Sequence, residues 1–364
     1  MKELNVALVG CGRISAKHAE LLGSGQIAGA RLCAVCDIVP SKAENVASRY
    51  GVRAYTDMHT MMRAEKNIDI VSVLTPSGCH AQNVLDLVAY KKHIIIEKPM
   101  ALTLDDADAM ISACDQNNIK LFVVKQNRFN PPVQRLKEAL VEGRFGKLVL
   151  GTVRVRWCRR QDYYDQDPWR GTWAQDGGVF TNQASHHIDL LEWMMGDVES
   201  VFTKTITALV NIETEDTGVA VLKFRSGALG IIEATTAARP KDLEGSISIL
   251  GERGSVEIGG FAVNQLKTWL FDNMTERDIE IQRVSHENPK NVYGFGHKAQ
   301  YDHIVDCIVN NRKTLVDGLE GRKSLEIISA LYESIETGQE IPLRFRPKKC
   351  RLGIYDRKNS HHSP

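Results

Sequence analysis

The sequence lacks an excess of charge of either sign. Its 364 residues include 46 Lys and Arg against 45 Asp and Glu, which leaves a formal net charge of +1. A nearly neutral chain has no electrostatic basis for binding nucleic acid or an anionic membrane surface as its main partner. The net charge does not exclude locally basic clefts that bind small anions. We therefore expect a small-molecule partner and no nucleic acid or membrane partner.

The sequence also lacks any long apolar run. None of its apolar stretches approaches the roughly 18 to 20 residues that are needed to span a bilayer. The first ten residues, MKELNVALVG, do not have the architecture of a signal peptide, because the short apolar run leads into a glycine-rich turn. We therefore expect a cytoplasmic protein.

Cysteine is present, but it is not arranged as a disulfide framework or a metal site. The eight cysteines are scattered, and only Cys33 and Cys36 form a C-x-x-C spacing. In a strand these two side chains would point to opposite faces, so we interpret them as buried thiols. We predict no metal site, because His186, His187 and Asp189 have no further ligands nearby at helical spacing.

Length and composition predict two folded domains. A chain of 364 residues exceeds one ordinary core, and 43% hydrophobic with 25% charged residues is typical of globular proteins. We expect a first domain at residues 1–126, a second domain at residues 127–347, and a flexible tail at residues 348–364.

Short β-branched runs alternate with helical patterns in the first of these domains. Strands are predicted at Val6–Val9, Leu32–Cys36, Ile70–Leu74, His93–Ile96 and Leu121–Val124. Helices are predicted at Ser15–Leu22, Ser41–Tyr50, His80–Ala89 and Leu104–Asn117. This alternation with short connections predicts an α/β Rossmann domain, which is a doubly wound parallel sheet.

The alternation of short strands with helices ends after about residue 127. An amphipathic helix opens at Pro131–Pro132, and two late helices are predicted at His297–Asn310 and Gly321–Thr337. Longer strands lie between them, at Leu148–Trp157, Val201–Val210, Thr217–Phe224, Ala228–Thr235, Ser246–Gly251 and Gly254–Ile258. Turn residues separate consecutive strands, so we predict an α+β domain with a large, mostly antiparallel open sheet.

A glycine-rich turn joins the first strand to the first helix. Gly10 and Gly12 permit a tight turn and a close approach of the backbone to a pyrophosphate, while Ser15 replaces the third glycine of G-x-G-x-x-G. Arg13 and Ile14 open the helix, whose free N–H groups bind anions. The alternative is an ordinary strand-to-helix turn. We predict that these residues bind a dinucleotide.

Asp37 ends the second strand, where a carboxylate can accept hydrogen bonds from a ribose diol. The same carboxylate would repel a 2′-phosphate, so we predict NAD as the cofactor, with NADP as the less favoured alternative because Lys42 lies nearby. Asp37 could also act only as a helix cap.

Three further segments carry a resemblance to a known family. They are Thr75–His80 (TPSGCH), Glu97–Pro99 (EKP) and Gly177–Asp189 (GGVFTNQASHHID). With the glycine turn, and in this order, they resemble the glucose–fructose oxidoreductase / inositol dehydrogenase / rhizopine-catabolism (Gfo/Idh/MocA) family. The resemblance covers the chain from about Leu4 to Pro347. It implies a Rossmann domain, a second domain on an open sheet, and sheet faces that pair subunits into homodimers or homotetramers.

The resemblance also implies the site residues. Further cofactor contacts are expected from Thr75, Pro76, His80, Glu97, Lys98 and Gln126. Lys98 would lie beside the nicotinamide, and His186 across the substrate hydroxyl. An ammonium at Lys98 can stabilise alkoxide character, and a histidine suits a general base for an alcohol proton. A surface lysine and a capping or core histidine are the alternatives.

Asn182 departs from the commoner pattern of the family, in which an aspartate stands four residues before the histidine. An amide cannot accept a proton, but it can hold a hydroxyl or a carbonyl. The departure argues against an aspartate–histidine relay. Asparagine at this position resembles the branch of the family that acts on nucleotide-linked acetamido sugars.

The segment after the domain junction predicts the substrate side. Arg154 and Arg156 alternate along a strand, and Trp169 lies in a loop rich in arginine and aromatic residues. Arginine suits carboxylates and diphosphates, and aromatic rings suit sugar faces. A solvated edge strand with a structural tryptophan loop is the alternative. Arg128 could reach either a substrate or an interdomain carboxylate.

These observations predict an oxidoreductase that oxidises a sugar ring hydroxyl with NAD. His186 takes the proton, Lys98 polarises the oxygen, and Arg128, Arg156, Trp169 and Asn182 bind the substrate. The resemblance to the nucleotide-sugar branch of the family implies UDP-N-acetylglucosaminuronate as the preferred substrate, oxidised at C3 in the biosynthesis of surface polysaccharide sugars. An inositol, aldose or dihydrodiol dehydrogenase is the alternative within the family. An NAD(P)-binding sensor without catalysis is the alternative of another class.

Overall fold

The computed structural model describes residues 3–284, 296–343 and 352. The chain divides into two compact units. The first unit holds residues 1–125 and 297–322, and the second holds residues 126–296 and 323–364. The tail predicted at residues 348–364 lies outside the described residues, apart from Leu352.

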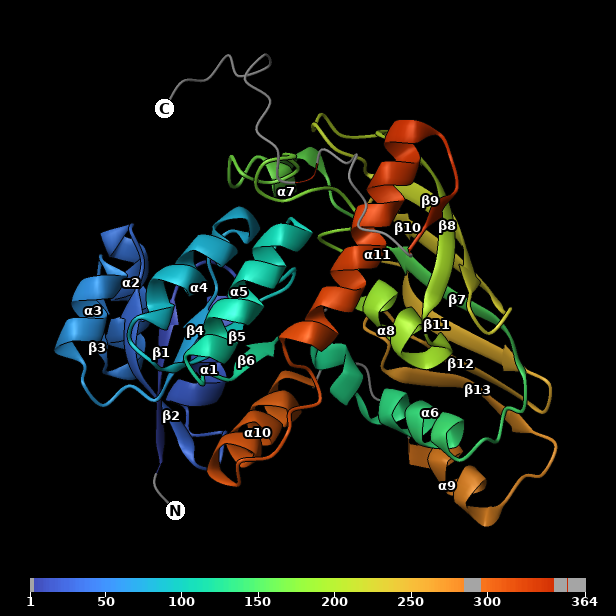
Figure 1. Ribbon diagram of the computed structural model, residues 1–364, viewed down its shortest axis with the longest axis horizontal. Coiled ribbons are helices and arrows are strands. Elements are labelled where there is room, and N and C mark those ends of the chain that lie inside the picture. Colours follow the sequence, from blue (N-terminus) through green and yellow to red (C-terminus); the bar gives the residue numbers. More distant parts are fainter. Residues whose placement is uncertain (1–2, 285–295, 344–351, 353–364) are drawn as a thin grey trace. The chain divides into compact units, whose positions relative to one another are not determined.

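The sheet of the first unit has six strands in the order β3-β2-β1-β4-β5-β6, and every pair is parallel (Figure 1). The strands are β1 (Leu4–Val9), β2 (Ala30–Cys36), β3 (Arg53–Tyr55), β4 (Ile70–Val73), β5 (His93–Ile96) and β6 (Leu121–Val123). The strand order reverses between β1 and β4, and ligands bind beyond the carboxyl ends of the strands at such a point. The predicted doubly wound parallel sheet is confirmed.

The central strands of this sheet are buried on both faces. All six residues of β1 are buried, which is typical of a parallel sheet that helices cover on both sides. The helices are α1 (Ser15–Gly23), α2 (Pro40–Tyr50), α3 (Met58–Ala64), α4 (His80–Val88), α5 (Leu104–Gln116) and α10 (Gly296–Val309), with a short 3₁₀ helix at Ser77–Cys79. Thr103 caps α5 by accepting a hydrogen bond from the amide of Asp106.

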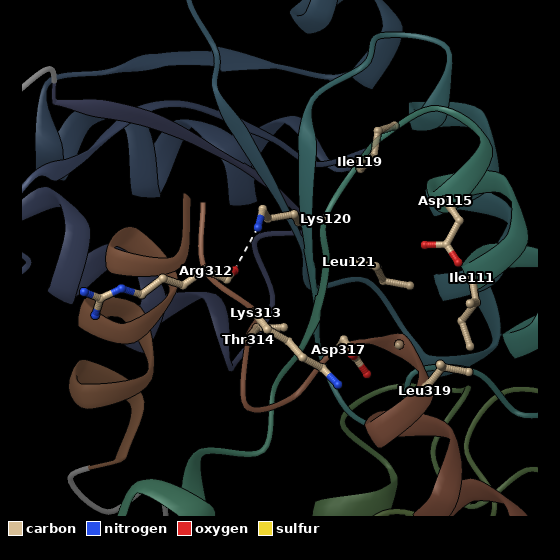
Figure 2. Close-up of a pocket in the computed structure, with 11 residues that line it drawn as sticks. Ile111, Asp115, Ile119, Lys120, Leu121, Arg312, Lys313, Thr314, Asp317 and Leu319 are labelled. Atoms are coloured by element: carbon tan, nitrogen blue, oxygen red, sulfur yellow. Dashed lines mark hydrogen bonds between the residues drawn. The ribbon is translucent and has the colours of Figure 1, made fainter. Parts of the chain in front are cut away.

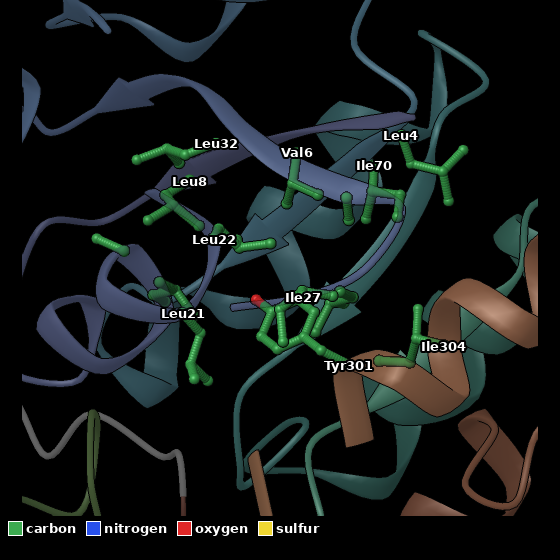
Figure 3. Close-up of a cluster of buried hydrophobic side chains, with 14 of the residues drawn as sticks. Leu4, Val6, Leu8, Leu21, Leu22, Ile27, Leu32, Ile70, Tyr301 and Ile304 are labelled. Carbon is green, nitrogen blue, oxygen red and sulfur yellow. The ribbon is translucent and has the colours of Figure 1, made fainter. Parts of the chain in front are cut away.

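Helix α10 packs into the core of the first unit, although it follows strands β7 to β13 of the second sheet in the sequence. Figure 3 shows Tyr301 and Ile304 of this helix beside Ile27, and the same buried cluster includes Leu4 and Leu22. The apolar stripe of α10 therefore completes a core that the first 125 residues begin.

The second unit is built on an eight-stranded sheet in the order β13-β12-β11-β7-β10-β9-β8-β14 (Figure 1). The strands are β7 (Leu148–Arg156), β8 (Val198–Ile206), β9 (Thr217–Phe224), β10 (Leu229–Thr235), β11 (Glu244–Gly251), β12 (Gly254–Gly259), β13 (Gln265–Phe271) and β14 (Ile341–Pro342). All pairs are antiparallel except β7 with β10. The predicted large, mostly antiparallel sheet is confirmed.

One face of this sheet is packed against helix α8, and the other face exposes apolar side chains. Burial alternates along β9, as expected for a sheet with one covered face. Gly151 of β7 lets α8 approach, because a Cβ there would lie 2.7 Å from the Met195 side chain. The helices of this unit are α6 (Pro131–Val141), α7 (Gln161–Tyr164), α8 (Ser185–Met195), α9 (Glu276–Val284) and most of α11 (Gly318–Thr337), with a 3₁₀ helix, η2, at Gln126–Phe129.

Several short or peripheral elements were not predicted, namely β3, α3, α7, β13, α9 and β14. Two of the three residues of β3 are exposed, so the strand lacks the apolar alternation that identifies longer strands. The strand predicted at Val201–Val210 runs instead from Val198 to Ile206, with a register shift near its start. Within the described residues, no helix is both long and apolar enough to cross a bilayer.

Candidate active site

The glycine turn has the geometry that a dinucleotide requires. Gly10 has φ +99°, and a Cβ there would lie 2.7 Å from the backbone carbonyl carbon of Leu74. Only glycine fits without strain at this position. A Cβ at Gly12 would meet nothing within 4 Å, so the backbone of Gly12 faces open space. No side chain caps the N-terminus of α1 after Ile14. The turn therefore offers space and helix amides to a pyrophosphate.

Asp37 lies directly beside this turn. Its carboxylate accepts hydrogen bonds from the amides of Cys11 at 2.7 Å and Val39 at 2.8 Å. It is partly exposed, whereas the next residue, Ile38, is 88% exposed. A carboxylate oxygen that accepts one amide retains a second lone pair. Asp37 thus braces the glycine turn and can still accept from a ribose hydroxyl.

His80 bridges the segments that follow β4 and β5. Its Nδ1 lies 2.8 Å from the carbonyl oxygen of Pro99, and its Nε2 lies 2.9 Å from that of Thr75. Burial lowers the pKa of His80, which favours a neutral ring that donates to one of these oxygens at a time. The predicted cofactor residues Thr75 and His80 are therefore joined to the Glu97–Pro99 segment.

Glu97 lies in a buried cluster with His18, His297 and Tyr301. Its Oε1 is 2.9 Å from His18 Nε2 and 3.9 Å from His297 Nε2, and its Oε2 accepts the amide N–H of Lys98 at 3.0 Å. Lys98 is partly exposed, unlike both of its neighbours in the sequence. It follows β5, at the carboxyl edge of the sheet where ligands bind in this fold.

A pocket of about 220 Å³ lies elsewhere in the first unit, beside α5 and β6 (Figure 2). Lys120 on its wall donates a hydrogen bond to the carbonyl oxygen of Arg312 at 2.8 Å. None of the predicted site residues lines this pocket, and we give it no part in the reaction.

In the second unit, His186 opens helix α8 and contacts Gln126. The two Nε2 atoms lie 3.0 Å apart, and both residues are buried. An amide NH₂ only donates, so His186 accepts at Nε2 in this arrangement. Gln126, which we predicted as a cofactor residue, thus holds the ring of the predicted catalytic base.

Arg128 forms a buried ion pair with Asp189. Its Nε and Nη2 donate to the two carboxylate oxygens at 2.8 and 2.9 Å, and its guanidinium lies 4.9 Å from the Trp193 ring. Both side chains are inaccessible to solvent, at 0% and 2% exposed. Asp189 is therefore occupied by Arg128. This pair joins η2 to α8, the two elements that carry Gln126 and His186.

Asn182 is held by a neighbouring carboxylate. Its Nδ2 donates to Asp176 Oδ1, while the other oxygen of Asp176 accepts the amide of Gly171 at 2.9 Å. An ionised carboxylate only accepts, so Asp176 selects the amide orientation of Asn182. The sequence carries an aspartate six residues before Asn182, and the structure brings the two side chains together.

Glu215 anchors the loop that leads into α8. It accepts hydrogen bonds from the amide of Phe180 at 3.1 Å and from the hydroxyl of Tyr332 at 2.9 Å. Burial raises the pKa of Glu215 to about 7. A Cβ at Gly178 would lie 2.1 Å from Glu215, so the loop requires glycine there.

Arg156 lies on the sheet face opposite α8. Its guanidinium makes two hydrogen bonds to Glu233, at 2.6 and 2.8 Å, and one to Glu244 at 3.3 Å. Val155, the next residue on β7, pairs with Gly245, where a Cβ would lie 3.0 Å from His187 of α8. Alternation along the strand therefore separates Arg156 from the face that carries His186.

The arginine and aromatic residues of the 159–173 loop do pack together. The guanidinium of Arg170 lies 4.6 Å from the rings of both Tyr163 and Trp169, and it pairs with Asp167 at 3.0 Å. A pocket of about 240 Å³ lies beside this group and includes Arg170 and Pro168 in its wall. Trp169 thus belongs to an ordered cluster with an adjacent cavity.

Four residues of these sites were not predicted from the sequence, namely His18, Tyr301, Asp176 and Glu215. His18 carried a usable signal, because it lies on the buried stripe of α1 with Ser15, Ala19 and Leu22. A histidine on such a stripe needs a hydrogen-bond partner. Tyr301 had no such signal, since nothing in its local pattern tells which core its helix joins.

The fold and these sites define an oxidoreductase with a Rossmann domain. Residues 4–125 match the model of the oxidoreductase family's NAD-binding Rossmann fold, and residues 137–343 match its C-terminal alpha/beta domain. The chain belongs to the Gfo/Idh/MocA oxidoreductase family, as its motifs predicted.

Two solved structures are similar over nearly the whole chain. The WlbA dehydrogenase from Bordetella pertussis, in complex with NADH and UDP-GlcNAcA, is 40% identical with a TM-score of 0.87, over 95% of this chain and 99% of that chain. The WlbA dehydrogenase from Chromobacterium violaceum, with the same two ligands, is 43% identical with a TM-score of 0.88, over 94% and 96%. Myo-inositol 2-dehydrogenase from Thermotoga maritima is 28% identical over 350 residues, which cover 93% of this chain and 98% of that protein.

Proposed function

We propose that this protein uses NAD⁺ to oxidise a sugar ring hydroxyl, and that its substrate is UDP-N-acetylglucosaminuronate oxidised at C3. The observation that carries the proposal is the 40% and 43% identity, over nearly full length, to two dehydrogenases whose structures contain NADH and UDP-GlcNAcA. The ketone would serve the biosynthesis of a surface polysaccharide sugar. The inositol dehydrogenase is more distant, at 28% identity.

The cofactor fits the residues that are present. A pyrophosphate fits the open space at Gly12, the tight turn that requires glycine at position 10, and the uncapped start of α1. A ribose without a 2′-phosphate fits the carboxylate of Asp37. NAD⁺, when bound, supplies the acceptor for the hydride that leaves the substrate carbon.

The chain's own residues handle the proton of the hydroxyl. His186 takes this proton at Nε2, whose lone pair becomes available when the substrate hydroxyl replaces the Gln126 amide as its hydrogen-bond donor. The Lys98 ammonium donates to the same oxygen and stabilises its negative charge while the C–H bond breaks. Asn182, oriented by Asp176, holds the ring. The alcohol thus loses one hydride and one proton and becomes a ketone.

A substrate panel tests the proposal. The purified protein is freed of bound nucleotide and mixed with UDP-N-acetylglucosaminuronate, UDP-N-acetylglucosamine, inositol or glucose, each with NAD⁺ or NADP⁺ and with or without 2-oxoglutarate. We expect NADH absorbance with the UDP-uronate and NAD⁺. NADH formation from inositol or glucose, with none from the UDP-uronate, would replace the substrate assignment. The 2-oxoglutarate arm shows whether bound NADH is reoxidised by a second substrate.

The catalytic lysine is tested separately. Lys98→Ala should lower kcat by about 10²- to 10³-fold, which is the usual effect of losing one donor to a developing oxyanion. NAD⁺ binding, measured by fluorescence titration, should stay nearly unchanged. Lys66→Ala is the matched control, because Lys66 is an exposed lysine of the same unit. A rate like that of the wild type for Lys98→Ala would remove the catalytic role.

We also propose that the exposed face of the eight-stranded sheet pairs subunits into a homodimer or homotetramer. Phe202, Val221 and Ile231 are cross-strand neighbours on this face and are 38%, 53% and 40% exposed. An apolar patch of this kind marks an interface. Light scattering after size exclusion should show an oligomer that Val221→Lys dissociates, while Val141→Lys on α6 has no effect. A monomeric wild type would exclude the pairing.

A further inference from the structure

The backbone on both sides of Lys98 is held by buried side chains of the first unit. The amide of Lys98 donates to Glu97 Oε2 at 3.0 Å, and the carbonyl oxygen of Pro99 lies 2.8 Å from Nδ1 of His80. Glu97 is 5% exposed and His80 is 1% exposed. Lys98 is therefore a partly exposed residue whose main chain is anchored from inside the domain.

The anchor at Glu97 is a carboxylate that acts only as an acceptor. Burial raises the pKa of Glu97, but the hydrogen bond from His18 and the nearby ring of His297, 3.9 Å away, outweigh burial and hold the pKa well below its usual range. One oxygen takes the Lys98 amide, so the other accepts from His18, whose Nε2 lies 2.9 Å away. His18 must therefore carry a proton on Nε2.

Tyr301 supports this state of His18 from the other side of the ring. Its hydroxyl oxygen lies 2.6 Å from His18 Nδ1. Burial raises the pKa of Tyr301, so the phenol keeps its proton. When the ring is neutral and protonated on Nε2, Nδ1 accepts and the phenol donates to it. The donors then run in one direction, from Tyr301 through His18 to Glu97, which also accepts from Lys98. His18 and Tyr301 are 0% and 3% exposed.

We propose that His18 and Tyr301 are positioning residues that fix the catalytic lysine through Glu97. The proposal rests on the proposed role of Lys98 in hydride transfer. Glu97 follows β5, His18 lies on α1 and Tyr301 lies on α10, so one hydrogen-bonded chain connects three elements to a single amide. Helix α1 is also the helix that begins at the glycine turn. The same helix thus positions the cofactor site and, through His18, the lysine.

The cost of burying these groups favours a positioning role over simple packing. A buried carboxylate loses its hydration, and apolar residues of the same volume often stabilise a core more. What an apolar core cannot supply is an acceptor aimed at one particular backbone amide. The network satisfies the Lys98 amide in one geometry, and a catalytic group must be held within a fraction of an ångström.

Four variants separate positioning from folding. His18→Met removes the donor to Glu97, and His18→Gln restores an N–H donor of similar reach. Tyr301→Phe removes only the hydroxyl and keeps the ring, so it tests the proposal even if His18→Met does not fold. His59→Met is the matched control, because His59 Nδ1 also contacts a tyrosine hydroxyl, that of Tyr90 at 2.9 Å, in the same unit.

Three measurements are made on each folded variant. They are kcat and KM in the NADH assay, the Kd for NAD⁺, and the acylation rate of each lysine in the substrate-free protein, followed by mass spectrometry. We expect His18→Met to lower kcat roughly 10²-fold, the effect of a displaced catalytic group, and to change the acylation rate at Lys98 alone. Tyr301→Phe should lower kcat about fivefold, equivalent to one hydrogen bond. The Kd for NAD⁺ should stay within about threefold.

The outcomes distinguish this proposal from the proposed function. His18→Gln should recover kcat to within about tenfold of the wild type, whereas His59→Met should match the wild type throughout. If His18→Met and Tyr301→Phe leave both kcat and Lys98 acylation unchanged, the proposal is overturned. If the wild type oxidises no sugar, the proposed function fails, and Lys98 acylation in the variants still decides the positioning role.

Discussion

The buried ion pair between Arg128 and Asp189 allows a stability prediction with a defined magnitude. Both charged groups are inaccessible to solvent, and two hydrogen bonds of 2.8 and 2.9 Å connect them. Asp189→Asn leaves the guanidinium buried with a neutral partner. Removing one partner of a buried pair costs about 3 to 5 kcal/mol, because the remaining charge has lost its hydration without compensation.

Urea unfolding measured by tryptophan fluorescence is the appropriate assay. All five tryptophans lie within residues 157–269, so the signal reports the second unit. With an m-value of about 2.5 kcal/mol/M, the expected loss moves the midpoint down by about 1 to 2 M. Because the pair joins η2 to α8, kcat should fall as well, through displacement of Gln126 from His186.

Two comparisons control this prediction. Glu142→Gln removes an exposed ion pair with Arg277 of similar length, 2.8 Å, and should cost less than about 1 kcal/mol. Replacing both buried partners, as Arg128→Met with Asp189→Leu, should recover most of the stability lost by Asp189→Asn alone. A midpoint for Asp189→Asn that matches the one for Glu142→Gln would refute the reasoning, since it would mean that the buried charge costs nothing to leave unpaired.

Three further predictions concern pH and the cofactor site. Burial lowers the folded-state pKa of His187 from 6.5 to about 3, so the unfolded chain binds an extra proton in acid and stability falls as pH falls from about 6.5. His187→Leu should remove this contribution of His187 to the pH dependence of stability. The stability of the variant relative to the wild type should therefore rise by about 2 kcal/mol between pH 8 and pH 5. A difference that stays constant with pH would show that the ring is not buried in neutral form. Gly10→Ala should destabilise the fold by at least about 1 to 2 kcal/mol, because of its positive φ and its backbone contact, whereas Gly12→Ala should weaken NAD⁺ binding with little change in thermal stability. Asp37→Ala should lower the preference in kcat/KM for NAD⁺ over NADP⁺ by roughly tenfold, the equivalent of one charge-assisted hydrogen bond, and an unchanged ratio would leave Asp37 as a brace of the turn only.

The amino-acid sequence by itself determines the features that depend on local pattern. Continuous apolar runs that alternate with helices specify a parallel sheet, because such strands must be covered on both faces. Alternation of apolar and polar residues specifies the open antiparallel sheet in the same way, because only one face of such a sheet is covered. The conformation of the glycine turn is also local, because the positive φ of Gly10 is one that only glycine adopts without strain.

Contacts between distant segments were decided only by the tertiary structure. Helix α10 carries an apolar stripe that either core could have buried, and it joins the first, where Tyr301 meets His18. The same holds for Arg128, whose partner Asp189 lies on α8, and for Arg156, which pairs with Glu233 across the sheet. Periodicity encodes which side of an element is buried, whereas a partner far along the chain is chosen by the packing of whole elements and the satisfaction of buried charge.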